Sequence, residues 1–181
     1  MKNLFNKYKT VVQFVALFLG TYLVLGILYS IYLKTSEAGA YFPDFITNLV
    51  AEQSSAVLAG FGYNSTLSPG QIDNAMLLTI NNEYSVSIVE GCNSISVLIL
   101  FVAFIIAFSE KFKKTFLFIF SGIVLIYIVN ILRIAFLVVA LHKFPEHENL
   151  LHSVVFPGVI YGIVFILWMV WVRMLSQVSK K

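Results

Sequence analysis

Four long apolar stretches constrain this chain more than any other feature of its sequence. The first, Val11–Tyr32, runs for 22 residues without a charged side chain. At a rise of about 1.5 Å per residue, a helix of that length crosses the ~30 Å hydrocarbon core of a bilayer. The other three stretches are Ser94–Phe108, Thr115–Leu141 and Val154–Val172. With 59% hydrophobic and only 12% charged residues, the chain cannot be a soluble globular domain.

These stretches predict an all-α polytopic membrane protein with about four transmembrane helices. We expect an N-terminal transmembrane helix in residues 1–33, an extracytoplasmic region in residues 34–91 and a core of three helices in residues 92–181. A cleaved signal peptide is the alternative for the first stretch, since Ala38–Ala40 resembles a cleavage site. That stretch exceeds the ~7–15 residues of a signal core and ends too early for the site, which favours a retained span.

The positive charges predict the orientation of these spans. In a four-span arrangement nine of the twelve Lys and Arg side chains lie on one side: Lys2, Lys7, Lys9, Lys111, Lys113, Lys114, Arg173, Lys180 and Lys181. Because positive residues are retained in the cytoplasm, we expect both termini there. The region between the first and second spans is then extracytoplasmic.

That region has two parts with different periodicity. Its first half, Phe42–Leu58, carries apolar side chains near helical spacing and predicts an amphipathic helix at the outer interface. Its second half alternates apolar and polar residues in Tyr84–Ile88, after an Asn81-Asn82 turn that follows Met76–Ile80. This alternation predicts a small β-hairpin.

Arg133 is the first candidate for a functional residue, because ionisable groups at membrane depth are costly and usually face an interior or a cavity. It lies 18 residues, or about 27 Å, beyond Thr115, near the outer edge of the hydrocarbon core. Tyr127 and Asn130 precede it at three-residue spacing, which places all three on one helix face. The alternative is an arginine that extends its stem outward to the interface.

Cys92, the only cysteine, lies at the same outer boundary, at the start of the second span and after Glu90. A single cysteine is usually a small packing residue, and it acts as a nucleophile only with a nearby cation or imidazole. His152 and His147 lie at the outer end of the fourth span and could supply the imidazole. Their spacing does not fit the His-Glu-x-x-His zinc motif, so we expect no metal site and no cofactor.

At these residues the sequence resembles the exosortase/archaeosortase superfamily, and most closely its short bacterial form, exosortase F. The resemblance rests on Val89–Ser96, on Asn130–Ile134 and on a histidine before an aromatic-rich last span. The usual Cys-Ser-Gly motif is replaced by Cys92-Asn93-Ser94, which departs from the family pattern at the local turn.

The resemblance implies a cysteine peptidase or transpeptidase that cleaves C-terminal sorting signals of exported proteins at the outer face of a bacterial cytoplasmic (inner) membrane. Cys92 would be the nucleophile, Arg133 would stabilise the oxyanion, and His152, with His147 as the alternative, would be the general acid and base. Glu90 and Asn130 would support them. The partners implied are substrates with a short motif, a transmembrane helix and a basic tail, and no nucleic acid.

A different class of function stays open on the residues alone. The chain would then be a non-enzymatic membrane scaffold or assembly factor, in which Arg133 and Glu90 form a structural ion pair at the interface. Catalysis requires Cys92 and a histidine as well, so the two functions predict different sets of essential residues.

Overall fold

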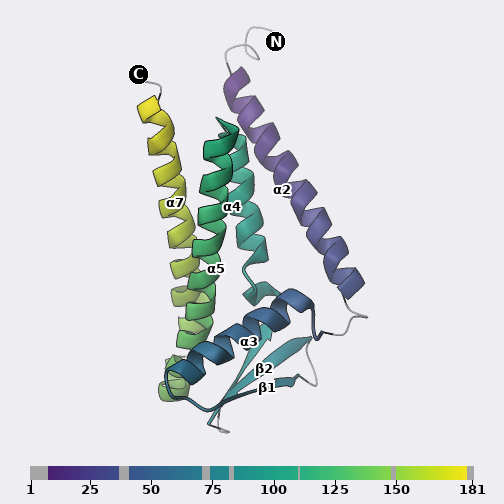
Figure 1. Ribbon diagram of the computed structural model, residues 1–181, viewed down its shortest axis with the longest axis vertical. Coiled ribbons are helices and arrows are strands. Elements are labelled where there is room, and N and C mark those ends of the chain that lie inside the picture. Colours follow the sequence, from purple (N-terminus) through teal and green to yellow (C-terminus); the bar gives the residue numbers. More distant parts are fainter. Residues whose placement is uncertain are drawn as a thin grey trace.

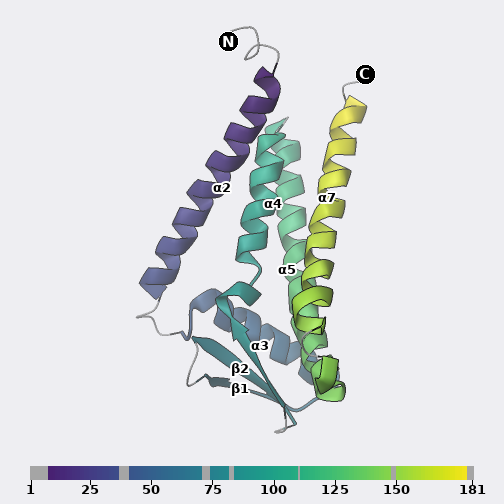
Figure 2. The same cartoon turned by 180° about the vertical axis from the view of Figure 1, so that it is seen from behind.

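Four helices run along a common direction, and a small cap of one helix and three strands lies across one end of them. The computed structural model describes residues 8–36, 41–70, 74–81, 84–109, 111–147 and 150–178. The long helices are α2 (Lys9–Ser36), α4 (Ile95–Ala107), α5 (Phe112–Lys143) and α7 (Phe156–Val178), as Figure 1 shows. Helix α3 (Phe45–Gly60) and the strands form the cap, and the start of α2 and the end of α7 lie at the opposite end (Figure 2).

Three of the expected spans have the length and apolarity needed to cross a membrane: Lys9–Ser36, Phe112–Lys143 and Ser153–Ser176. The predicted second span corresponds to α4, which has only 13 residues and is therefore about 20 Å long. An α-helix needs about 20 residues to cross the hydrocarbon core unaided. The chain is thus a membrane protein with three candidate spanning helices, and the fourth crossing stays a prediction.

The predicted amphipathic helix is present as α3, and its start is fixed by side-chain capping. The Asp44 Oδ1 accepts hydrogen bonds from the backbone N–H groups of Ile46 (2.9 Å) and Thr47 (3.1 Å), which have no partner within the helix. The Tyr32 hydroxyl, near the end of α2, donates to the same carboxylate oxygen at 3.0 Å. The end of α2 and the start of α3 are therefore held together.

The predicted hairpin is also present, as the strands β2 (Ala75–Ile80) and β3 (Tyr84–Val89), which pair antiparallel. A third strand, β1 (Ser65–Pro69), pairs antiparallel with the other edge of β2, so the sheet order is β1-β2-β3. The sequence pattern did not predict β1. Leu78 pairs with Leu67 on one side and Val86 on the other.

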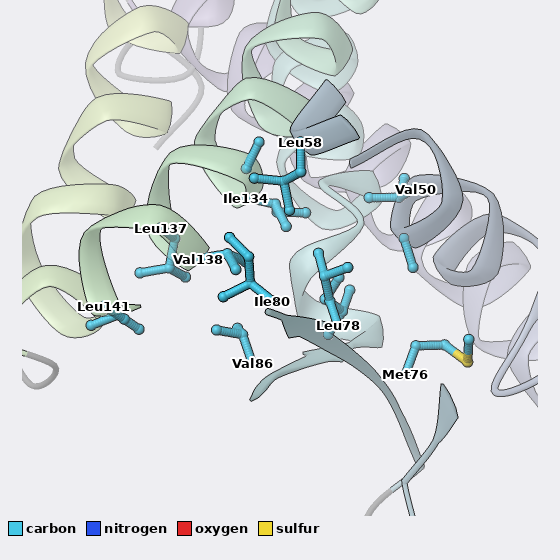
Figure 3. Close-up of a cluster of buried hydrophobic side chains, with 13 residues drawn as sticks. Val50, Leu58, Met76, Leu78, Ile80, Val86, Ile134, Leu137, Val138 and Leu141 are labelled. Carbon is cyan, nitrogen blue, oxygen red and sulfur yellow. The ribbon is translucent and has the colours of Figure 1, made fainter. Parts of the chain in front are cut away.

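One face of this sheet is apolar and packs against α3 and the last third of α5. We call the buried residues between them the cap cluster, and Figure 3 shows how side chains from the three elements converge. Because side chains alternate across a strand, Leu78 and Ile80 on β2 and Ile88 on β3 can share this face. The cap cluster consists of Val50, Ala51, Leu58, Met76, Leu78, Ile80, Val86, Ile88, Ile134, Ala135, Leu137, Val138 and Leu141.

A second cluster joins the other parts of the helices, and we call it the bundle cluster: Leu98, Phe101, Ile105, Ile126, Val164 and Trp171. Its members come from α4, α5 and α7. Helix α2 has no buried residue and lies along α4, where the Phe14 and Phe108 rings have centroids 4.3 Å apart. Helix α5 is the element that contributes to both clusters, with Ile126 in one and Ile134 in the other.

Candidate active site at the junction of cap and bundle

Cys92 lies in η1 (Glu90–Cys92), a single 3₁₀ turn that connects β3 of the cap to α4 of the bundle. Its thiol is free, the residue is partly buried, and it packs against the cap cluster. Glu90 begins the same turn and is also partly buried. The predicted nucleophile therefore occupies the boundary between the two hydrophobic clusters.

Asn130 fixes this turn to α5. Its Nδ2 donates a hydrogen bond of 2.7 Å to the backbone carbonyl of Cys92, and the Asn130 side chain is buried. Asn130 lies 18 residues after Phe112, so the bonded carbonyl is about 27 Å along α5 from the start of that helix. This distance approaches the ~30 Å thickness of the hydrocarbon core. Because Asn130 lies three residues, or about 4.5 Å, before Arg133 on α5, the bond places the predicted nucleophile within one helical turn of that arginine's level.

A second asparagine, Asn93, joins three elements directly beside Cys92, and the sequence analysis gave it no role. The buried Asn93 Nδ2 lies 2.8 Å from the Tyr29 hydroxyl of α2 and 3.0 Å from the Thr47 Oγ1 of α3. Its Oδ1 accepts from the backbone N–H of Ile95 at 3.0 Å, one of the unpaired donors at the start of α4. Non-helical backbone at membrane depth must be satisfied by protein groups, and Asn93 and Asn130 satisfy it here.

Ser94 has the backbone conformation that glycine adopts most easily. Its φ is 65° and its ψ is 0°, in the left-handed region, and its side chain is buried with an Oγ that has no hydrogen-bond partner among the residues that the structure describes. Glycine occupies this position in the motif that the sequence resembles. The turn therefore keeps a glycine-like conformation with a serine in place.

Arg133 lies one turn beyond Asn130, on the side of α5 that faces α7. The residue is partly buried, and its Nε is buried with no hydrogen-bond partner among the described residues. The side chain lines a cavity of about 220 Å³ together with Val129, Leu132, Phe136 and Val159. The cavity lining is apolar, so the carbon stem of Arg133 lines it and the buried Nε does not.

The three polar residues at three-residue spacing on α5 point to three different elements. The Tyr127 hydroxyl donates to the Gln53 Oε1 of α3 at 2.7 Å, Asn130 binds η1, and Arg133 lines the cavity beside α7. Each step of three residues turns the helix by about 300°, so the set fans over about 120° and does not form a single line. The three residues that the sequence placed on one face therefore spread over about a third of the circumference of α5.

The two candidate histidines follow the end of α5. His147 ends η2 (Pro145–His147) and is exposed, with its Nδ1 3.5 Å from the Glu146 Oε1. The backbone of His152 belongs to η3 (Leu151–Val155), a π-helical turn, but its side chain lies outside the described residues. Among the described residues, neither His147 nor Arg133 makes a hydrogen bond to the Cys92 thiol. Within the part of the chain whose side chains are described, the structure thus joins Cys92 with Asn130 and not with a histidine.

A family model described as transmembrane exosortase matches residues 10–172, which is 163 of the 181 residues. The chain belongs to the transmembrane exosortase family. Membership indicates that this exosortase is a membrane-embedded protein that processes sorting signals. No curated protein and no solved structure matched in the same comparisons. The resemblance to exosortase F in particular stays a prediction.

Proposed function

We propose that this exosortase is a cysteine peptidase or transpeptidase that cleaves C-terminal sorting signals of exported proteins, with Cys92 as its nucleophile. The observation that carries the proposal is the 2.7 Å hydrogen bond from Asn130 to the Cys92 carbonyl. It fixes the backbone of the nucleophile to the helix that carries Arg133, while the thiol makes no hydrogen bond among the described residues. A fixed backbone with an available side chain is what a positioned nucleophile requires.

The proposed reaction has two steps, formation of a thioester with Cys92 and its breakdown. The Cys92 thiolate attacks the scissile carbonyl carbon, and the thiol proton goes to His152, or to His147 as the alternative. The tetrahedral intermediate expels the leaving amine, which takes that proton, and a thioester with Cys92 remains. Water or an acceptor amine then attacks the thioester and releases Cys92 as the thiol.

Arg133 is proposed to stabilise the oxyanion of the tetrahedral intermediate. Its guanidinium carries a permanent charge, and its buried Nε has no partner among the described residues. A positive charge in apolar, water-poor surroundings interacts with a developing negative charge more strongly than it would in water. The same charge favours the thiolate form of a neighbouring cysteine.

The proposed setting is the bacterial inner membrane, with both termini in the cytoplasm and the site at the extracytoplasmic side. The positive charges near the start of α5 support this orientation, because Lys111, Lys113 and Lys114 lie at the end of the bundle away from the cap. The proposed substrates carry a short motif, a transmembrane helix and a basic tail.

The test compares C-terminal peptides of membrane and secreted proteins from cells that carry the wild-type chain, Cys92→Ala or Cys92→Ser at matched membrane levels. We expect specific proteins to retain their hydrophobic C-terminal tails in both variants, with processing reduced by at least about 10³-fold, as for other nucleophile replacements. Full processing by Cys92→Ser would refute the mechanism. If all the proteomes match and deletion of the protein still causes a defect, the chain acts as a scaffold.

A further inference from the structure

The peptide group between Cys92 and Asn93 is held by hydrogen bonds on both of its polar atoms. Its carbonyl oxygen accepts from the Asn130 Nδ2 at 2.7 Å, and its N–H donates to the Glu90 carbonyl at 3.3 Å. Because a peptide group is planar, the two bonds together restrain its orientation. The torsions that follow it, at Asn93, are restrained by the side chain of Asn93 itself.

The Asn93 side chain uses its full donor capacity on other elements. Its Nδ2 donates to the Tyr29 hydroxyl of α2 at 2.8 Å and to the Thr47 Oγ1 of α3 at 3.0 Å, while its Oδ1 accepts from the Ile95 N–H at 3.0 Å. A side-chain amide has two N–H groups to donate, so both are used here. Asn93 is only 1% exposed, so water does not easily replace a lost partner. Removal of the Tyr29 hydroxyl would therefore leave a buried N–H unpaired.

Tyr29 is the contact through which α2 reaches the turn of Cys92. Helix α2 has no buried residue and lies beside α4 on the outside of the bundle (Figure 2). The ring of Tyr29 stacks on that of Tyr32, with centroids 6.0 Å apart, and the Tyr32 hydroxyl donates to Asp44 instead. Two tyrosines on one face of α2 thus bind different targets. A comparison of the two separates support of the turn from attachment of α2 to the cap.

We infer that Asn93 is a positioning residue for Cys92, and that its bond to Tyr29 makes α2 part of the support of the nucleophile. The inference rests on the proposed function, in which the thiolate must lie in line with a scissile carbonyl. A displacement of about 1 Å at a reacting group can cost about 10²-fold in rate. In this role neither Asn93 nor Tyr29 exchanges a proton or a bond with the substrate. Asn93 holds the backbone next to Cys92, and Tyr29 acts through Asn93.

The first test measures kcat and KM for a substrate whose tail Cys92→Ala leaves uncut, at equal amounts of folded protein in the membrane. We expect kcat to fall about tenfold in Tyr29→Phe and about 10²-fold in Asn93→Ala, with KM within about twofold of the wild type. The reason is that a displaced nucleophile slows the chemical step and leaves binding unchanged. A purely structural role would reduce the amount of folded protein and leave its kcat at the wild-type value, which would overturn the inference.

Two further tyrosine replacements on α2 are the controls. Tyr22→Phe removes a hydroxyl that makes no hydrogen bond among the described residues, at a position 40% exposed, so kcat and the unfolding midpoint should not change. Tyr32→Phe removes the hydroxyl bonded to Asp44, so it should lower the unfolding midpoint without lowering kcat. An equal loss of kcat in Tyr29→Phe and Tyr32→Phe would overturn the inference, since α2 would then act only through its attachment to the cap.

The double variant Tyr29→Phe/Asn93→Ala tests whether the two residues act through one bond. Asn93→Ala already removes that bond, so we expect the double variant to have the kcat of Asn93→Ala alone. A further tenfold loss would show that Tyr29 acts by another route, against the inference.

A last measurement reports on the turn without any substrate. Cys92 is the only cysteine, so N-ethylmaleimide alkylates a single site. We expect several-fold faster alkylation in Asn93→Ala and Tyr29→Phe, because the turn opens more often, and the wild-type rate in Tyr22→Phe. An unchanged rate in Asn93→Ala would overturn the inference, and the proposed function would stand as long as Cys92→Ala leaves tails uncut. If Cys92→Ala processes normally, the proposed function fails and the positioning role fails with it, whatever the alkylation rates.

Discussion

The two ends of α5 lie in different surroundings. Toward its C-terminus, Ile134, Ala135, Leu137, Val138 and Leu141 are all buried in the cap cluster. Before Asn130, the buried residues of the same helix are only Thr115, Gly122 and Ile126. Helix α2 differs from the cap even more than the first part of α5 does, because none of its residues is buried. One end of α5 thus lies in the packed core of the cap, and the other end leaves most of its side chains unburied.

The difference shows that the two regions are stabilised by different interactions. The cap removes apolar surface from water, which contributes about 25 cal/mol for each Å² buried. Lipid is as apolar as leucine, so the bundle gains little from burial and depends on close packing between helices. Examples are the stacked Phe104 and Trp168 rings, with centroids 4.4 Å apart, and Gly122 against Phe101. The proposed site lies where the two regions meet.

Arg133→Gln gives the largest expected effect and tests whether the junction can be changed without harming either region. We expect processing to fall by about 10²–10³, the usual loss when an oxyanion donor is removed, because the charge is lost at nearly constant volume. Arg133→Lys keeps the positive charge but lacks the planar guanidinium, so its processing rate should lie between those of the wild type and Arg133→Gln. Initial processing rates and thermal unfolding in detergent are the measurements. A variant that loses activity only because it unfolds would contradict the assignment.

Leu78→Ala tests the cap. Leu78 is fully buried in the cap cluster, so the cavity left by its truncation should cost about 2–5 kcal/mol of unfolding free energy. The control is Leu23→Ala on α2, which is 59% exposed to its surroundings and should change stability by less than about 0.5 kcal/mol. Protease sensitivity of the cap and denaturant unfolding in micelles measure the difference. Equal losses in the two variants would remove the distinction between the regions.

Gly122→Ala tests the bundle, whose stability we expect to depend on close packing between helices more than on burial of apolar surface. A Cβ at Gly122 would overlap the ring of Phe101, which is itself fully buried in the bundle cluster. We expect a loss of about 1–3 kcal/mol, seen as a lower unfolding midpoint in detergent. Gly158→Ala on α7 is the control, because a Cβ there meets open space and should be neutral or slightly stabilising. An unchanged midpoint in Gly122→Ala would show that the bundle is loosely packed.

Ser94→Gly has the smallest expected effect, and it should raise stability where the preceding variants lower it. The substitution relieves a left-handed serine and removes a buried hydroxyl without a partner, so it should stabilise the junction by about 1 kcal/mol with processing unchanged. Ser96→Gly, two residues later in α4, should instead cost about 0.5 kcal/mol, since serine is the better helix former. Alkylation of Cys92, the only cysteine, reports opening of the junction directly. Faster alkylation in Ser94→Gly would be the contrary result.

The sequence predicted those parts of the fold that depend on periodicity. The long spans, α3 and the pairing of β2 with β3 are where their apolar patterns indicated. Strand β1 was missed because Ser65–Pro69 has Leu67 as its only apolar residue besides proline, which gives no alternating pattern. The strand forms because its backbone pairs with β2. The predicted second span, Ser94–Phe108, exceeds α4 by only one residue at each end, and whether this short helix crosses the membrane stays a prediction.

The candidate site was predictable in part. Cys92, Asn130 and Arg133 were singled out as polar residues in apolar surroundings, and the structure bonds Asn130 to Cys92, with Arg133 one helical turn further along α5. The role of Asn93 could not be predicted, because its partners Tyr29 and Thr47 lie 64 and 46 residues away in sequence. No local spacing connects residues that far apart. Whether His152 or His147 is the catalytic base stays a prediction.

The difference in length between α4 and α5 sets a condition on the surrounding lipid. Helix α4 reaches only about 20 Å from its inner end, whereas α5 continues for about 48 Å. Because η1 is bonded to α5 about 27 Å from the start of that helix, close to the ~30 Å thickness of the hydrocarbon core, a thicker bilayer would draw this turn into hydrocarbon. Water is one of the proposed co-substrates. Membrane thickness would then control how far the reaction favours hydrolysis, through hydrophobic mismatch at a single short helix.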